Sequence, residues 1–417
     1  MLATARAERH VVREVAWREG GQMLQLLPSA GVFGANASGK SNVLKAMDDM
    51  QTYVVQSFRR GSPTGGIKRF PFRLDPASIR HPSRYEIDFV VAGVRHEYGF
   101  VLDDERILEE WALRYPKGRA SLLFRRIGDD VEIGSAARPQ TRAVTRLLRH
   151  NALFLSTAAS ANHPALLPLY EWFRHNLMLA EAGSRPIRQA FTAYLLESPT
   201  SRQLVLALLK AADLGVSDAI VREVDAGARD RIERAAKILM GDDEPPENVE
   251  TTLLPIFNDV WLKHGGVAGD LELDPAEESF GTLVWLGLVG PVVDALAEGT
   301  VLLADELDAS LHPELVARLV RLFQEPHTNP YRAQLIFNTH DVTLLGDSGE
   351  DRLLGRDQVW FTEKFGDGST RLYALADLDP RKHEAVAKRY LAGRYGARPI
   401  LSEGQFDMLG ELIGSDA

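Results

Sequence analysis

The chain has 417 residues, a formal net charge of -10 and no cysteine. Without cysteine it has no disulfide bonds, thiol nucleophiles or thiolate metal sites, and its acidic balance argues against a protein that coats nucleic acid through bulk positive charge. The hydrophobic share of 45% and the charged share of 25% are those of a folded globular protein. The length predicts two or three domains, or one large α/β domain with an insertion.

The first segments predict a strand, a glycine-rich turn and a helix. An apolar run at residues 23–33 leads into the turn, and the helix after it has apolar side chains near helical spacing, from Val43 to Val54. Alternating polar and apolar residues at 85–91 and 96–102 then predict half-buried antiparallel strands. We expect these strands in a β sub-sheet at about residues 70–135.

The middle of the chain predicts helices. Leu, Ala and Arg recur at helical spacing in several runs, including residues 168–182 and 219–240. The acidic, proline-bearing segment 241–248 marks the far edge of this region. We therefore predict a helical insertion at 141–245 that separates the N-terminal half of one domain, 1–140, from its C-terminal half, 246–417.

The C-terminal half predicts buried strands that alternate with helices. Residues 299–306 and 333–340 are predicted buried strands, residues 311–323 form a predicted helix between them, and residues 357–375 are a predicted hairpin. Such alternation is typical of a mainly parallel sheet.

No segment is predicted to enter a membrane. The N-terminal segment lacks an apolar core of signal-peptide length, and the longest apolar stretch, Leu283 to Leu296, is interrupted by glycine, proline and aspartate. We expect a cytoplasmic protein.

Residues 34–41, GANASGKS, fit the phosphate-loop pattern GxxxxGK[ST] and lie between a predicted strand and helix. In such a loop, glycines let the backbone N–H groups point at phosphate oxygens, and the helix N-terminus adds its dipole. Lys40 is expected to reach the β- and γ-phosphates, and Ser41 to bind Mg²⁺. A glycine-rich turn with an incidental lysine is the alternative, and the flanking strand and helix argue against it.

Two further polar clusters follow predicted buried strands. Asp305 and Glu306 end the strand at 299–306. We expect Asp305 to hold Mg²⁺ and Glu306 to polarise the water that attacks the γ-phosphate. His340 ends the strand at 333–340 and is expected on the γ-phosphate side of the site; an isolated histidine at a strand end would more often be structural.

Six ordered blocks then carry a resemblance: GANASGKSN, EESFGT, LLADELDASLHP, FNTHD, RDQVWFTEK and YLAGRYGARPIL. They resemble the signature blocks of bacterial ABC-type ATPases that carry an AAA name, relatives of the SMC, RecF and overcoming-lysogenisation-defect ATPase heads, several of which act in anti-phage defence. The resemblance runs from about residue 29 to 401. It implies an α/β ABC-type P-loop ATPase head, with a mainly parallel core sheet, an antiparallel β sub-sheet and a helical insertion.

The resemblance also implies site residues, with ATP and Mg²⁺ as cofactors. Ser41 and Asp305 would hold the metal, and Glu306 and the switch histidine His340 would be catalytic. In a head-to-head dimer, three residues would contact the nucleotide of the opposite subunit: Ser279 and Gly281 of the ABC signature, and Asp308 of the D-loop. The nucleotide-binding residues would be Gly34, Asn36, Ala37, Ser38, Gly39, Lys40, Ser41 and Asn42. On the sequence alone, ESFGT is equally a plain helix start with Ser279 as its cap.

The functional hypothesis is an ATP-dependent homodimer, or a higher oligomer of dimers, that controls a partner effector, with a nuclease as the candidate class. A rival hypothesis is a DNA-clamping factor of the RecF or SMC kind, with a basic face built from Arg142, Arg146, Arg149 and Arg174. A third is a sensor that binds ATP and hardly hydrolyses it. Neither the residues that contact the base nor a glutamine loop can be assigned, although Pro71–Leu74 lies in a similar place to that loop.

Overall fold

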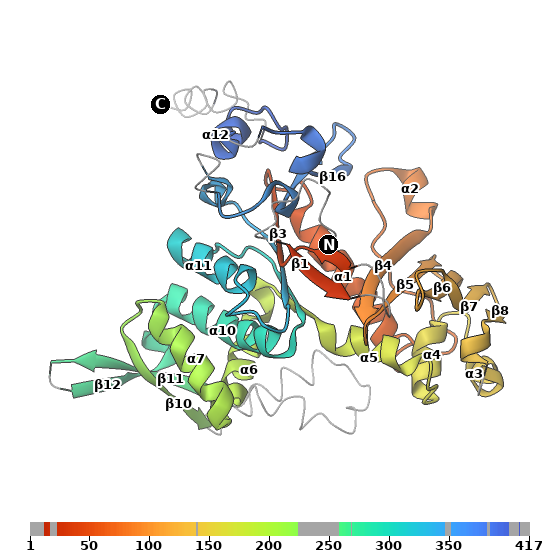
Figure 1. Ribbon diagram of the computed structural model, residues 1–417, viewed down its shortest axis with the longest axis horizontal. Coiled ribbons are helices and arrows are strands. Elements are labelled where there is room, and N and C mark those ends of the chain that lie inside the picture. Colours follow the sequence, from red (N-terminus) through yellow and green to blue (C-terminus); the bar gives the residue numbers. More distant parts are fainter. Residues whose placement is uncertain are drawn as a thin grey trace, which may run out of the picture.

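The structure is a computed structural model that describes residues 12–16, 23–138, 141–223, 258–267, 269–346, 352–381, 384–399 and 408. The acidic segment 241–248 and most of the helix predicted at 219–240 lie outside these residues. Three regions are apparent in Figure 1: a central sheet with its helices, an antiparallel sheet on one side, and a small sheet that projects on the other.

The central sheet has six strands in the order β16-β15-β3-β14-β13-β9. All neighbouring pairs are parallel except β15 with β16, which form the predicted hairpin. The strands are β3 (Ser29–Gly34), β9 (Leu177–Ala180), β13 (Val301–Ala304), β14 (Gln334–Asn338), β15 (Val359–Lys364) and β16 (Thr370–Ala374). Because parallel neighbours end at the same edge of a sheet, the polar residues that follow β3, β13 and β14 meet there.

Helices cover this sheet and fill the core. The largest hydrophobic cluster includes side chains from β13, β14 and β15 and from the helices packed on them. The principal helices here are α1 (Lys40–Gln56), α6 (Arg185–Glu197), α7 (Pro199–Ala211), α10 (Phe280–Glu298), α11 (Pro313–Gln324) and α12 (Val386–Leu391). Among the described residues, α10 alone is long and apolar enough to span a membrane, but 61% of its most apolar window is buried inside the protein, as a core helix requires.

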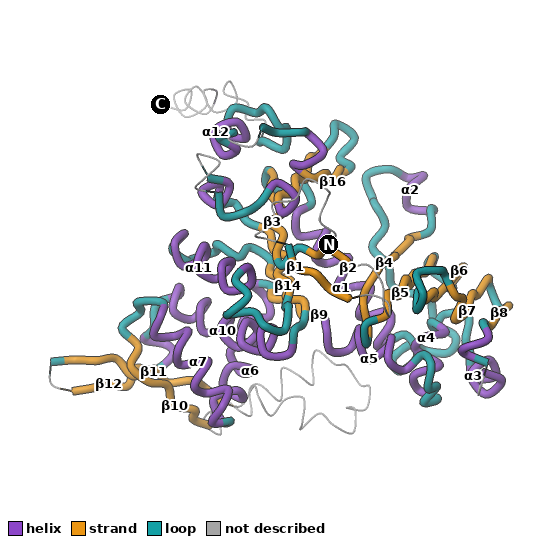
Figure 2. The backbone as a smooth tube through the Cα atoms, in the orientation of Figure 1, coloured by secondary structure: helices purple, strands orange, loops and turns teal. Residues whose placement is uncertain are grey.

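The antiparallel sheet confirms the predicted β sub-sheet. Its five strands pair in chain order (Figure 2), and they are β4 (Ser83–Val91), β5 (Val94–Leu102), β6 (Ile107–Arg114), β7 (Ser121–Ile127) and β8 (Asp130–Ile133). Its inner face packs on α1 and on three helices C-terminal to the sheet, and together they bury a second core. Those helices are α3 (Thr141–Leu147), α4 (Phe154–Ser160) and α5 (Leu167–Asn176). The N-terminal strands β1 (Arg13–Ala16) and β2 (Met23–Leu26) form a separate pair, and a short helix α2 (Pro76–Arg80) precedes β4.

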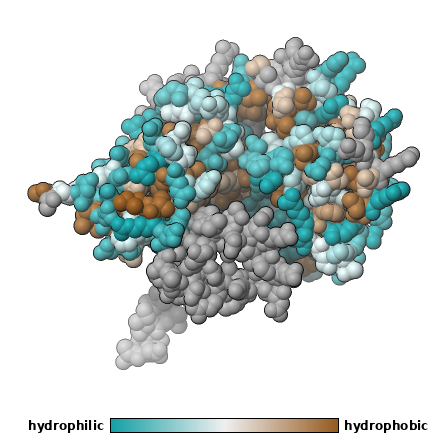
Figure 3. All heavy atoms as spheres, turned by 90° about the horizontal axis from the view of Figure 1, so that it is seen from below, coloured by the Kyte–Doolittle hydropathy of each residue, from teal (hydrophilic) through white to brown (hydrophobic). Residues whose placement is uncertain are grey.

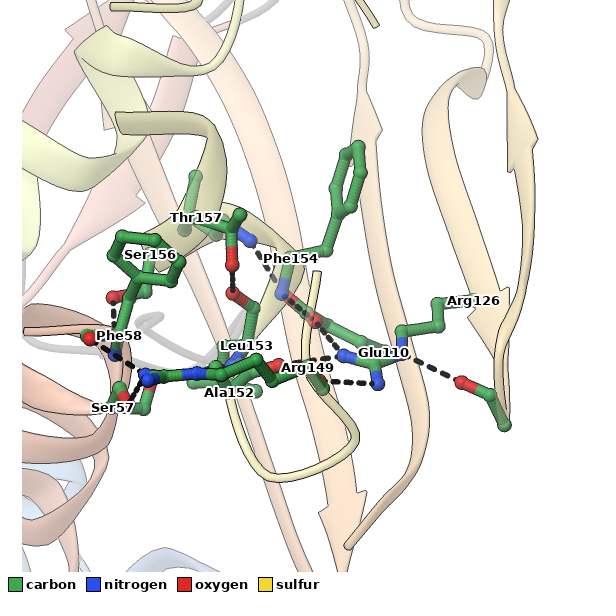
Figure 4. Close-up of polar contacts among 12 residues, drawn as sticks. Ser57, Phe58, Glu110, Arg126, Arg149, Ala152, Leu153, Phe154, Ser156 and Thr157 are labelled. Atoms are coloured by element: carbon green, nitrogen blue, oxygen red, sulfur yellow. Dashed lines mark hydrogen bonds and ion pairs between the residues drawn. The ribbon is translucent and has the colours of Figure 1, made fainter. Parts of the chain in front are cut away.

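A buried polar network ties this second core together (Figure 4). Glu110 of β6, fully buried, accepts hydrogen bonds from the first two backbone N–H groups of α4 and lies 4.0 Å from the guanidinium of Arg126 on β7. Arg126 donates to the carbonyl of Arg149, and the Arg149 guanidinium donates to the carbonyls of Ser57 and Phe58, just beyond α1. The far end of α1 is therefore fixed to the antiparallel sheet.

The predicted helical insertion is interrupted by strands, which corrects two of its segments. The run 168–182 was predicted as one helix, but α5 ends at Asn176 and β9 follows directly as an edge strand of the central sheet, paired with β13. The start of the predicted helix at 219–240 falls in β10 (Val216–Glu223), which pairs with β11 (Asn258–Gly266). With β12 (Gly269–Leu273), these strands form the small projecting sheet of Figure 1. Pairing with a neighbouring strand decides both segments, and helix propensity cannot anticipate it.

Candidate nucleotide site

The phosphate loop lies where β3 ends and α1 begins, as predicted. A Cβ atom on Gly34 would lie 2.5 Å from both the carbonyl oxygen and the hydroxyl of Thr362, so only glycine fits there. Gly39 caps α1 with a φ of 97°, and Ala37 also has a positive φ, 58°. These left-handed residues curl the loop over the helix N-terminus, the arrangement that binds phosphate groups.

Lys40 is the first residue of α1 and is buried. Its ammonium group donates to the carbonyls of Gly34 at 3.0 Å and Ala35 at 3.1 Å. Burial lowers the pKa of Lys40, and the nearby carboxylates of Glu306, Asp308 and Asp305 partly offset that effect. The Lys40 ammonium group is thus held inside the loop, and the nearby carboxylates favour its charged form.

The hairpin β15–β16 contacts the phosphate loop through hydrogen bonds to Ser38. The buried Ser38 hydroxyl is 2.6 Å from the hydroxyl of Thr362 on β15, and Thr370 on β16 donates to the Ser38 carbonyl at 3.0 Å. Sequence reasoning missed these two threonines. Only the position of β15 beside β3 reveals them.

Asp305 and Glu306 follow β13, and Asn338 at the end of β14 links them. The Asn338 amide donates to the Asp305 carboxylate and, at 3.5 Å, to the hydroxyl of Ser41. Its side-chain oxygen accepts from the Glu306 backbone N–H at 2.6 Å. Asn338 is fully buried, whereas the Glu306 side chain is exposed toward the cavity it lines. The structure therefore brings Ser41 and the two predicted carboxylates to one edge of the sheet.

His340 and Asp308 lie beside the same edge. Both carboxylate oxygens of Asp308 accept from the backbone N–H of His340 at 3.2 Å. This contact links the segment after β13 to the segment after β14 and leaves the His340 ring exposed.

One large cavity, of about 1580 Å³, collects most of the predicted residues. Glu306 and His340 line it together with the phosphate-loop residues Asn36, Ala37, Gly39, Lys40, Ser41 and Asn42. Gly34 and Ser38 line an adjoining cavity of about 910 Å³ on the other side of the loop, and Asn36 and His340 line both. Pro71–Leu74 also line the large cavity.

Glu181 is a cavity-lining carboxylate that sequence reasoning missed. It directly follows β9, whose last residue is in register with Ala304, the residue before Asp305. Its side chain lies 3.8 Å from the Lys45 ammonium. The only signal in the sequence was a strand-length apolar run, 177–180, hidden among helix-forming residues.

Ser279 and Gly281 stand apart from both cavities, whose lining does not include them. Ser279 caps α10, because its hydroxyl accepts from the Thr282 backbone N–H at 3.1 Å. A Cβ atom on Gly281 would lie 2.8 Å from the carbonyl oxygen of Ser310, two residues after Asp308. Ser279 is exposed and does not line either cavity of its own subunit.

The residues around Ser41 and Asp305 fit Mg²⁺. Both present oxygen atoms, both are hydrogen-bonded to the same Asn338 amide, and the phosphate loop lies beside them. Mg²⁺ binds through one or two carboxylates together with substrate phosphates and water, and a hydroxyl from the phosphate loop completes that ligand set.

Residues 29–346, well over half of the chain, match the model of a family described as "AAA domain, putative AbiEii toxin, Type IV TA system". No curated protein matches the chain. Among solved structures, it is similar to an Smc head bound to the C-winged helix domain of ScpA, with 12% identity, a TM-score of 0.38, and coverage of 87% of this chain and 97% of that one.

Two further structures give similar values. An SMC head domain from Thermotoga maritima has 12% identity and a TM-score of 0.36 over 87% of this chain and 97% of that one. An Smc head with an extended coiled coil, bound to the C-terminal domain of ScpA derived from Pyrococcus furiosus, has 12% identity and a TM-score of 0.33 over 87% and 95%. The family match rests on the sequence itself and includes the phosphate loop, the Asp305-Glu306 strand and His340. The chain belongs to this family of AAA domains.

Proposed function

We propose that the chain binds ATP with Mg²⁺ and hydrolyses it, and that ATP joins two copies head to head. The observation that carries the proposal is the convergence of Lys40, Glu306 and His340 on one cavity, beside Ser41 and Asp305. These residues come from three parallel strands that end at the same edge. A phosphate-binding loop facing a carboxylate pair is the arrangement that phosphoryl transfer to water requires.

Each residue has a distinct part in the proposed reaction. The loop N–H groups and Lys40 bind the phosphates, and Mg²⁺ would neutralise their charge when held by Ser41 and Asp305. Glu306 accepts a hydrogen bond from the attacking water and orients it toward the γ-phosphate. His340 lines the cavity together with the loop, and its ring can donate to a γ-phosphate oxygen.

The proposed dimer follows from the position of the signature segment. Ser279 is an exposed helix cap outside the cavity of its own subunit. A second copy would place Ser279 and the Gly281 N–H on the γ-phosphate, and ATP would then stabilise the dimer because both copies bind it.

The proposed partner is an effector protein, with a nuclease as the first class to test, in anti-phage defence. The family description, which names a putative toxin and a toxin–antitoxin system, supports a two-component arrangement. The DNA-clamping alternative has less support. Two arginines of its postulated basic face are engaged elsewhere: Arg149 donates to the carbonyls after α1, and Arg174 pairs with Glu171.

Steady-state turnover of ATP with Mg²⁺ tests the proposal. We expect Lys40→Ala to lose nucleotide binding, and Glu306→Gln to bind ATP normally but turn over at least about a hundred-fold more slowly. Glu105→Gln, an exposed carboxylate on the loop before β6, is the matched control and should behave as wild type. Normal turnover in Glu306→Gln would refute the catalytic assignment, and ATP binding without turnover in the wild-type protein would support the sensor alternative.

A further inference from the structure

A partly buried hydrogen bond between a histidine and a glutamate lies directly next to the signature segment. His264 Nε2 is 2.7 Å from Glu278 Oε1. The Glu278 side chain is only 4% exposed and that of His264 is 22% exposed. A carboxylate so far removed from water needs a partner, and among the described residues the structure gives it this histidine. The contact is therefore a structural constraint, unlike the exposed His327–Glu325 pair on the protein surface.

Glu278 immediately precedes Ser279. It follows a short 3₁₀ turn, Pro275–Glu277, and its extended backbone, with ψ of 151°, leads directly into the cap of α10. Fixing the Glu278 side chain fixes the direction from which the chain enters the helix. The position of the Ser279 hydroxyl and of the N–H groups at the start of α10 depends on that direction.

The other side of the segment is held by the loop after β13. Gly281 packs so closely on the carbonyl of Ser310 that no side chain would fit between them. Ser310 is two residues from Asp308, which accepts from His340. The segment 278–281 is thus held on one side by Ser310, in the loop after β13, and on the other side by His264.

His264 belongs to the central strand of the small projecting sheet. It pairs with Val216 of β10 on one side and Leu271 of β12 on the other. The β11–β12 hairpin extends away from the body of the protein in Figures 1 and 3, and Val267 at its turn is fully exposed. The projecting sheet therefore meets the signature segment in two ways, through this side-chain contact and through the short stretch of chain from the end of β12 to Glu278.

We infer that His264 is a positioning residue that acts through Glu278 to hold Ser279 and the start of α10 in the orientation needed by the nucleotide of the opposite copy. The inference rests on the proposed function and goes beyond it, because it assigns control of the second half-site to the projecting sheet. It also separates ATP binding within one subunit from completion of the site by the second copy. The residues that bind ATP within one subunit line another part of the molecule and do not contact His264 or Glu278.

Three variants test the inference: His264→Ala, Glu278→Ala and the double variant. ATP affinity measured on dilute, monomeric protein should stay within about two-fold of wild type, whereas kcat and ATP-driven dimerisation should fall about ten-fold, the effect of about 1.4 kcal/mol lost from a charge-assisted hydrogen bond. The double variant should lose no more than either single variant, because both remove the same contact. His327→Ala is the control and should match wild type.

His264→Gln distinguishes positioning from general damage to the fold. Glutamine can still donate to the Glu278 carboxylate, so this variant should recover most of the lost kcat. Thermal melting shows whether each variant is folded; if His264→Ala does not fold, His264→Gln and Glu278→Ala decide the question. Wild-type kcat and dimerisation in His264→Ala, or equal losses in the Gln and Ala variants, would overturn the inference. A wild-type protein that neither hydrolyses ATP nor dimerises would instead refute the proposed function.

Discussion

At the scale of single residues, Asn338 organises the metal side of the candidate site. Its one amide group contacts the Asp305 carboxylate, the Ser41 hydroxyl and the Glu306 backbone. It is fully buried, so each of these contacts replaces one that water would otherwise make. Residues that orient metal ligands in this way contribute to metal affinity although they do not bind the metal themselves.

We expect Asn338→Ala to weaken Mg²⁺-dependent nucleotide binding by about 10–100-fold, because Asp305 and Ser41 lose their common orienting partner. Titration of Mg²⁺ at a fixed concentration of a non-hydrolysable ATP analogue measures this. Asn329→Ala is the control: Asn329 is also buried, and its hydrogen bonds to Phe323 and Ala333 serve only the fold. That variant should lose stability and keep its Mg²⁺ affinity. Equal Mg²⁺ affinities in all three proteins would contradict the orienting role.

Some residues of the candidate site lie in one contiguous segment of the chain, and others come together only through strand pairing. The phosphate loop could be predicted because its pattern, strand and helix are contiguous in the chain. The contacts of Asn338 and the position of Glu181 could not, since they depend on which strands are neighbours. In the order β14-β13-β9, the pairing of β9 with β13 joins segments more than 100 residues apart along the chain, and a single sequence carries no direct record of that pairing.

At the scale of elements, the buried pair Glu110–Arg126 joins the antiparallel sheet to α4 and, through Arg149, to the end of α1 (Figure 4). Both side chains are fully buried. We expect Arg126→Met to reduce the free energy of unfolding by about 3–5 kcal/mol, because it leaves the Glu110 charge buried without its partner. Denaturant unfolding measures this, and Glu109→Gln, the neighbouring carboxylate on the same strand, should change stability by less than about 0.5 kcal/mol.

The pH dependence of stability offers a second measurement on Glu110. Burial raises the pKa of Glu110, and the Arg126 charge and the hydrogen bonds it accepts only partly offset this. A carboxyl whose folded-state pKa is raised binds its proton more tightly in the folded state. The contribution of the Glu110 carboxyl to the free energy of unfolding is therefore full at pH values below its unfolded-state pKa, near 4.5. That contribution is lost as the pH rises through the folded-state pKa. The difference in unfolding free energy between wild type and Glu110→Gln should shrink as the pH rises over this range; a difference that grows would contradict the assigned direction.

Helix packing provides a matched pair of glycines. α10 and α6 approach closely at Gly290, where a Cβ atom would lie 2.5 Å from the Thr192 hydroxyl and 3.0 Å from its Cα atom. We expect Gly290→Ala to destabilise the protein by about 1–3 kcal/mol through overpacking. Gly287, one turn earlier, has no atom nearer than 3.4 Å, so Gly287→Ala should be neutral or stabilising by up to about 1 kcal/mol. Thermal unfolding of the two variants gives the answer, and similar effects would contradict the packing argument.

Two segments predicted as helix form strands instead, because each pairs with a neighbouring strand. Leu177–Ala180 is composed of good helix formers and follows a helix directly, yet it pairs with β13. Ala219–Glu223, the larger part of β10, falls within the helix predicted at 219–240, although the β-branched side chains of β10 suit the strand that it forms. The long helices α1 and α11 were predicted correctly because several turns of consistent pattern outweigh one tertiary contact, whereas only the start of α10 was predicted.

At the scale of the whole molecule, the residues that line the cavity and the signature segment are separate. Lys40 and Glu306 line the cavity, whereas Ser279 lies outside it, and the next residue, Phe280, is 58% exposed. The Arg185 guanidinium lies 4.5 Å from the Phe280 ring centre and covers one side of it. In the proposed function, the residues that bind the nucleotide and the segment that contacts the second copy are therefore separate parts of one subunit.

This separation predicts how ligand binding and protein concentration act together on stability. In Glu306→Gln, ATP with Mg²⁺ stays bound, and binding to the folded state raises stability by about 2.7 kcal/mol at a hundred times the dissociation constant. If ATP also joins two copies, the melting temperature must rise further with protein concentration, because dimerisation is a second linked equilibrium. Adding Ser279→Arg should abolish the concentration dependence and leave the ligand-dependent part, since the arginine blocks contact with the second copy and does not line the cavity. Melting temperatures that rise with ATP but never with protein concentration would mean that the chain binds its nucleotide as a monomer, and the proposed dimer would then be wrong.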